Sequence, residues 1–134
     1  SGTAEASADV AAVAAELAAA VCDPLRGRLH AVLDGADDDA DAAADGIRAA
    51  YREWRSRLPD VGEHHAAAAY GLGVYDAAPD GARLRWLVDD GGSPCPDCDD
   101  NALAGAVVKG EPYPTGQVVP PAHAGCRCLL VPAG

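Results

Sequence analysis

Apolar residues recur at helical spacing through the first part of the chain. Val10, Val13, Leu17 and Val21 lie three or four positions apart, and this spacing places side chains on one face of an α-helix. Alanine, the strongest helix former, fills many of the positions between them. The pattern predicts a helix over residues 4–22.

Two prolines fall within the helical pattern. The aspartate before Pro24 is typical of a helix N-cap with proline at the first helical position. We therefore expect either a second helix or a kinked continuation at this point. Apolar residues at helical spacing predict a further helix over residues 42–58. Pro59 is expected to end that helix, and the next one is expected over residues 60–77.

The hydrophobic period changes from helical to alternating near residue 80. Apolar and charged residues alternate over residues 82–89, which indicates a half-buried strand. A short strand is predicted at 106–109. A last strand at 128–131 is expected to pair antiparallel with the first. We therefore predict an α+β fold, in which N-terminal helices precede a small antiparallel β unit.

The chain is expected to be a single domain over residues 1–134, with a helical part at 1–78 and a β-rich part at 79–134. Its composition predicts a thin hydrophobic core. It contains no Phe, no Met and two Trp, and burial stabilises in proportion to apolar area, by roughly 25 cal/mol per Å². A bound metal would compensate for such a core in the C-terminal part.

Net charge and hydropathy argue against two classes of partner, nucleic acid and membrane. The net charge of −11 repels phosphate backbones and argues against nucleic-acid binding. No apolar run approaches the ~20 residues that a membrane-spanning helix needs. The N-terminus also lacks the basic start of a signal peptide.

The charged residues are segregated along the sequence. Aspartates crowd into residues 34–45, and Arg48, Arg52 and Arg55 follow. Residues 34–41 are expected to form an exposed loop, because like charges repel one another and the spacing of a calcium-binding EF-hand is missing. The arginines are expected to form a solvated helix face or to pair with the aspartates. Their alternative use is to anchor an acidic protein partner or nucleic acid.

Four of the five cysteines form two tight pairs near the C-terminus, namely Cys95 with Cys98 and Cys126 with Cys128. Two such pairs joined by a loop are what a tetrahedral zinc ion needs from one chain. The prolines and aspartates around the first pair predict a loop. Because negative neighbours raise thiol pKa values, a redox dithiol is disfavoured. Disulfides are the third interpretation. We predict one structural Zn²⁺ ion that staples the β unit.

Five donors compete for four positions on the ion. We favour Cys95, Cys98, Cys126 and Cys128, because residues two apart in an extended segment face the same side. In the alternative, His123 replaces Cys128 as a ligand. Otherwise His123 supports the site from outside by donating to a thiolate or a carbonyl.

No catalytic site is predicted. Four filled positions leave no room on the metal for water or substrate, which is typical of a structural site. The sequence shows no nucleophile–base arrangement and no phosphate-binding loop. Cys22 lies alone in the first helix, where we expect it to pack in the core or between helices. No catalytic residue and no cofactor other than zinc is therefore expected.

The cysteine-containing segments carry a family resemblance. Cys-Pro-Asp-Cys at 95–98, a glycine-rich stretch, and Pro-Pro-Ala-His-Ala-Gly-Cys-Arg-Cys at 120–128 resemble the closing signature of the phage Mu F-like minor head proteins, also called head morphogenesis proteins. Members commonly carry a P-P-x-H-x-x-C-R element after an upstream cysteine-containing segment. The resemblance covers roughly residues 60–132.

The resemblance implies a non-enzymatic role in virion assembly. It implies portal or capsid proteins as partners, and a location in the bacterial cytoplasm or in the virion, from a phage or a prophage. Two rival functions stay open. One is a zinc-stabilised cytoplasmic adaptor for protein interactions, and the other is a metal- or thiol-dependent enzyme.

Overall fold

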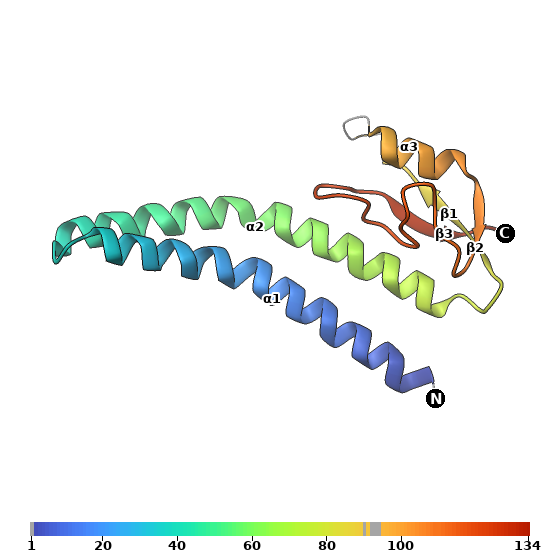
Figure 1. The fold of residues 1–134 in the computed structure, drawn as a ribbon, viewed down its shortest axis with the longest axis horizontal. Coiled ribbons are helices and arrows are strands. Elements are labelled where there is room, and N and C mark those ends of the chain that lie inside the picture. Colours follow the sequence, from blue (N-terminus) through green and yellow to red (C-terminus); the bar gives the residue numbers. More distant parts are fainter. Residues whose placement is uncertain (1, 90, 92–94) are drawn as a thin grey trace. The chain divides into compact units, whose positions relative to one another are not determined.

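The computed structural model describes residues 2–89, 91 and 95–134, with side chains described from residue 10 onward. Helices and strands follow one another in the order α1 (Gly2–Gly35), α2 (Ala40–Ala77), β1 (Arg83–Leu87), α3 (Pro96–Leu103), β2 (Ala106–Val108) and β3 (Leu129–Pro132) (Figure 1). The predicted α+β class, with helices ahead of a small antiparallel sheet, is confirmed.

Both helices run on through their prolines. Pro24 lies inside α1, so the kinked-continuation alternative is the one nearer the structure. Pro59 lies inside α2, and the prediction that it ends a helix is wrong. A proline removes one backbone hydrogen bond, whereas two new helix ends would leave several N–H and C=O groups without helical partners. With good helix formers on both sides, continuing costs less than breaking.

The chain divides into two compact units, residues 1–62 and 63–134. The boundary between them falls inside α2 and not after it. Whether the two units act as a single domain, as the sequence predicts, stays a prediction. Each unit has its own packing and is described separately.

The first unit is a hairpin of α1 and the first part of α2. Asp39 caps α2, because its Oδ1 atom accepts hydrogen bonds from the amides of Asp41 at 3.0 Å and Ala42 at 3.1 Å. Between the helices, the indole N–H of Trp54 donates to the carbonyl oxygen of Val21 at 2.7 Å. Ala50 is buried there with 2% of its surface exposed.

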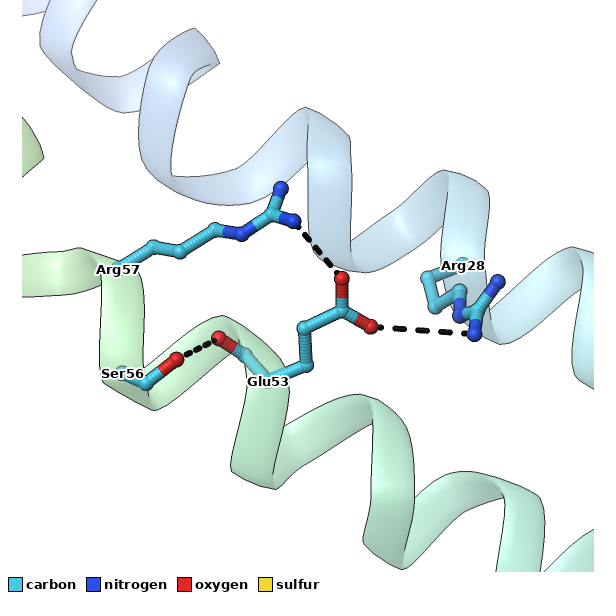
Figure 2. A network of polar contacts seen from close by, with 4 residues as sticks. All are labelled: Arg28, Glu53, Ser56 and Arg57. Carbon is cyan, nitrogen blue, oxygen red and sulfur yellow. Dashed lines mark hydrogen bonds and ion pairs between the residues drawn. The ribbon is translucent and has the colours of Figure 1, made fainter.

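A groove of about 260 Å³ lies between these two helices, lined in part by Pro24, Trp54 and Leu58. Figure 2 shows the polar network on its wall. Glu53 binds Arg57 at 2.9 Å on its own helix and Arg28 of α1 at 3.8 Å. These groups are exposed, so each ion pair contributes little. The charges on this side of α2 nevertheless already have partners.

The second unit is built on a three-stranded antiparallel sheet in the order β2–β1–β3. In β1, Leu84 and Trp86 are buried while the residues on either side are exposed, as the alternating pattern predicts. Trp86 lies opposite Leu130 of β3. The predicted antiparallel pairing of the last strand with the first is confirmed. The ring of Tyr113 packs edge-on against Trp86, with 5.1 Å between centroids.

A buried asparagine fixes the loop after β2 to α3. Asn101 has no exposed surface. Its side chain donates to the Thr115 hydroxyl at 2.7 Å and accepts from the Thr115 amide at 3.1 Å. These bonds give a buried polar side chain the partners that it needs.

Replacing Asn101 by Ala is expected to lower the free energy of unfolding of the second unit by about 1–3 kcal/mol, because the Thr115 amide loses its acceptor. Urea unfolding of the metal-loaded protein measures the change. Asp100→Ala is the matched control, because Asp100 is the exposed neighbour of Asn101 on the same helix and its side chain makes no such bond. Equal stability of the two variants would contradict the structural role of Asn101.

Candidate metal centre

The first cysteine pair lies at the N-terminus of α3. Cys95 is the N-cap residue, and its sulfur accepts a hydrogen bond from the Cys98 amide at 3.4 Å. Cys98 follows within the first turn and is buried. The prediction of a loop here is wrong. Proline at the first helical position and two aspartates in the first turn are a helix-start signal, although the same residue types are also common in loops.

The second donor segment is the chain that leads into β3. Pro120 is buried and contacts Gly71 of α2, where an added Cβ would lie 3.2 Å from the proline carbonyl oxygen. Gly125 has a positive φ of 79°, a conformation that glycine adopts without strain. It turns the chain back so that the Cys126 amide donates to the carbonyl oxygen of His123 at 3.2 Å.

Cys126 and Cys128 both point inward and Arg127 points outward, as the spacing of two predicts. The two cysteines are 3% and 4% exposed. The Arg127 guanidinium pairs with Asp89 at 3.2 Å and with Glu63 at 3.7 Å. The alternation therefore delivers two sulfurs to one side of the segment.

The five predicted donors lie close together and could bind a metal. Two groups of three, whose ligand atoms lie within 4.8 Å of one another, share Cys98: one adds Cys95 and His123, and the other adds Cys126 and Cys128. Three shorter distances connect four of the donors. The Nε2 atom of His123 lies 2.9 Å from the Cys95 sulfur and 3.3 Å from the Cys98 sulfur. The Cys98 and Cys126 sulfurs are 3.7 Å apart.

The orientation of the His123 ring is set by its other nitrogen. Nδ1 lies 2.8 Å from the carbonyl oxygen of Ala124, which can only accept, so Nδ1 carries a proton. In the neutral ring Nε2 then presents a lone pair toward the sulfurs. The bond to Ala124 raises the pKa of the ring. A metal would therefore compete with a proton for Nε2.

The thiols have divergent proton affinities. The amide and side chain of Cys98 lower the pKa of Cys95. Burial raises the pKa of Cys98, and the neighbouring cysteines raise it further. Burial also opposes ionisation of Cys126, but backbone hydrogen bonds from Ala122 and Cys128, together with the side chains of Cys128 and Cys98, lower its pKa overall. Crowded thiols resist ionising together, and a cation among them removes that resistance.

Trp86 borders the site next to Cys128. Its indole N–H is buried and finds no hydrogen-bond partner of ordinary length among the described residues. Burial raises the pKa of Cys128, and the interaction with Trp86 partly offsets this rise. This contact was not predicted, because the alternating pattern identifies Trp86 only as a buried strand residue.

All five cysteines are free thiols, so the disulfide interpretation gains no support. Cys22 is exposed, and the prediction that it packs in the core or between helices is wrong. The paired cysteines are among the residues that line a cleft of about 760 Å³, together with Val88, Asp89 and Arg127. The site is therefore reachable from solvent.

Comparisons with known proteins identify no relative of this chain. No protein family, curated protein or solved structure matches this chain. None of the helices in the described ranges combines the length and apolarity that crossing a bilayer requires. The function must therefore be argued from the donors themselves and from the resemblance of their sequence.

Proposed function

We propose that the second unit binds one structural zinc ion through Cys95, Cys98, His123 and Cys126. The single observation that carries this proposal is the chain of three short distances that connects these four donors. Thiolate and imidazole are the ligands that zinc prefers. The 3.7 Å between the Cys98 and Cys126 sulfurs is close to the ~3.8 Å edge of a tetrahedron with Zn–S bonds of about 2.3 Å.

In this ligand set His123 takes the position that the sequence pattern assigns to Cys128. A ring whose Nδ1 is held by a carbonyl and whose Nε2 faces the thiols is the usual arrangement of a metal-binding histidine. Cys128 then supports the site from behind, between Cys98 and Trp86. Zinc would hold the N-terminus of α3 against the segment before β3.

His123→Ala is therefore expected to lose zinc, whereas Cys128→Ser should retain it with affinity reduced by about 10- to 100-fold, the usual cost of changing a group outside the ligand shell. Elemental analysis after dialysis against a weak chelator compares the two variants with the parent chain. Cobalt substitution supplies a second measurement, because thiolate-to-cobalt charge-transfer bands report on the number of sulfur ligands.

The opposite result would identify the other ligand set. If His123→Ala retains zinc and Cys128→Ser loses it, the four-cysteine site predicted from the sequence is the correct one. The proposal of a zinc site would stand in either case, because the two ligand sets share Cys95, Cys98 and Cys126 and differ only in the fourth ligand. Retention of zinc by both variants would contradict the requirement for His123, because it would show that the fifth donor fills the vacated position.

The function supported by this closed site is non-enzymatic. Four protein ligands leave no open position for water or substrate, and the site joins two segments of a unit with few large buried side chains. The resemblance of residues 95–128 to the phage minor head proteins supports a role in virion assembly. In that role, the zinc-stapled unit keeps the shape of a surface that binds a portal or capsid protein.

An assembly role predicts that the gene for this chain lies beside portal, terminase and capsid genes. It also predicts that the purified chain co-sediments with portal rings or procapsids from the same source. The rival adaptor function predicts neither. Loss of co-sedimentation after zinc removal would connect the metal site to the assembly surface.

A thiol-dependent enzyme is the second candidate, and one observation favours it. Cys95 caps a helix N-terminus and has a lowered pKa, which is the setting of many reactive thiols. This function predicts that Cys95 reacts rapidly with an alkylating reagent in the metal-loaded protein. A structural zinc site predicts that Cys95 is protected until the metal is removed.

A further inference from the structure

A stripe of charged residues runs along α2 within the first unit. Its members are separated alternately by four and three positions, so they lie above one another on a single helix face. All of them are exposed. The α2 stripe consists of Asp41, Asp45, Arg48, Arg52 and Arg55. Helical periodicity places it opposite Ala50 and Trp54, which face α1.

The charges along the α2 stripe change sign at a point near its middle, which makes the α2 stripe complementary to an antiparallel copy of itself. The acidic residues come first and the basic residues follow, with the change of sign between Asp45 and Arg48. Asp41 and Arg52 lie equally far on either side of that point. An identical helix laid antiparallel about this point would therefore place an acid opposite each of these bases, and a base opposite each acid.

Most of the α2 stripe lacks a partner inside the chain. Asp45 and Arg48 pair with each other at 2.8 Å, and both are exposed. Asp41, Arg52 and Arg55 form no ion pair with any residue in the described part of the chain. The charges on the groove side differ, since Glu53 already binds two arginines (Figure 2).

We propose that the α2 stripe is a dimerisation surface for a second copy of this chain, bound antiparallel with Asp41 of each copy opposite Arg52 of the other. A partner that is acidic throughout would face Asp41 and Asp45 as like charges. A basic partner would face three arginines. Only a partner with the reversed order of charges satisfies both signs of the α2 stripe. An antiparallel copy has that order and offers an opposite charge to every member of the α2 stripe except Arg55.

The first unit buries few side chains, which favours association with a second copy. Among residues 10–62, Ala50 is the one buried side chain, and small units with little burial usually need oligomerisation to be stable. Small side chains flank the α2 stripe at Ala42 and Ala49, both exposed, and allow a second helix to approach closely. Tyr51 beside the stripe is 48% exposed and supplies apolar area for the contact.

Sedimentation equilibrium of the full metal-loaded chain, at several concentrations and salt levels, tests this proposal. The parent chain is expected to dimerise with a Kd that rises with salt, because exposed charge pairs are screened. Arg52→Asp and Asp41→Arg should each raise that Kd roughly 10- to 100-fold, since each change creates two symmetry-related like-charge contacts. Arg26→Asp, an exposed change on α1, is the control and should leave the Kd unchanged.

Two recombinations separate the antiparallel register from a general charge effect. An equimolar mixture of the Arg52→Asp and Asp41→Arg chains should form heterodimers with the parent Kd, because each acid again meets a base. The double variant Asp41→Arg/Arg52→Asp should recover homodimers, with the net charge unchanged. Far-UV circular dichroism verifies that each variant keeps its helices.

A parent chain that sediments as a monomer at every concentration overturns the proposal. If the parent chain dimerises and neither single substitution changes the Kd, the interface lies elsewhere and the proposal is wrong. Weakening by both single changes without recovery in the mixture and the double variant excludes the antiparallel pairing.

Discussion

Cys98→Ser is expected to abolish metal binding altogether, so that the metal content falls from about one zinc per chain to about zero. Cys98 is the donor common to both groups of three, and it lies 3.3 Å from His123 Nε2 and 3.7 Å from the Cys126 sulfur. Its loss therefore disables either ligand set. A hydroxyl is a poor substitute, since it stays protonated and binds zinc weakly compared with a thiolate.

The structural consequence should be large. Structural zinc supplies on the order of 10–16 kcal/mol in small metal-dependent folds, which is comparable with the whole stability of a typical domain, about 5–15 kcal/mol. We expect Cys98→Ser to lose the near-ultraviolet dichroism of Trp86 and Tyr113. Cys22→Ser is the matched control, because Cys22 is an exposed thiol on α1 outside the cluster. A Cys98→Ser chain that keeps its zinc would refute the site.

Removal of the metal by a strong chelator is expected to expose the four clustered thiols together. In the loaded protein, a thiol reagent should react rapidly with Cys22 alone. After chelation it should react with all five cysteines, because the ion no longer protects the sulfurs and the second unit loosens. The Cys22→Ser chain should show almost no rapid reaction before chelation and four reacting thiols after it.

Acid is expected to act like the chelator. Zinc binds the deprotonated thiolate and the neutral imidazole, so protons compete with the ion and occupancy falls as pH falls. Zinc release followed by a coloured zinc indicator during an acid titration measures this directly. If Cys95 reacts before any zinc is released, the closed structural site is wrong and the thiol-enzyme function is favoured.

The strands and the donors were predictable because each depends on short-range pattern. The alternation from Ala82 to Asp89 predicts which residues of β1 are buried, and the structure agrees. The spacing of Cys126 and Cys128 predicts that both sulfurs face one side and Arg127 the other. In each case a period of two follows from local backbone geometry alone.

The errors arise where a local signal was overruled or had two meanings. Pro59 predicts a helix end, but a long helix tolerates one missing hydrogen bond. Pro96 and the aspartates after it suit a loop as well as a helix start, and the structure forms α3. Cys22 lies on a helix that offers little burial, so its side chain is exposed.

The sequence by itself determined that long helices precede the strands, the alternation of β1 and the five donors that gather at one site. These depend on spacing, which acts over a few residues. Only the tertiary structure decided how those donors meet. The turn at Gly125, the packing of Pro120 on Gly71 and the cap at Cys95 together place His123 between two sulfurs and leave Cys128 beside Trp86. Such placement depends on contacts between residues far apart in the chain, which no local pattern records.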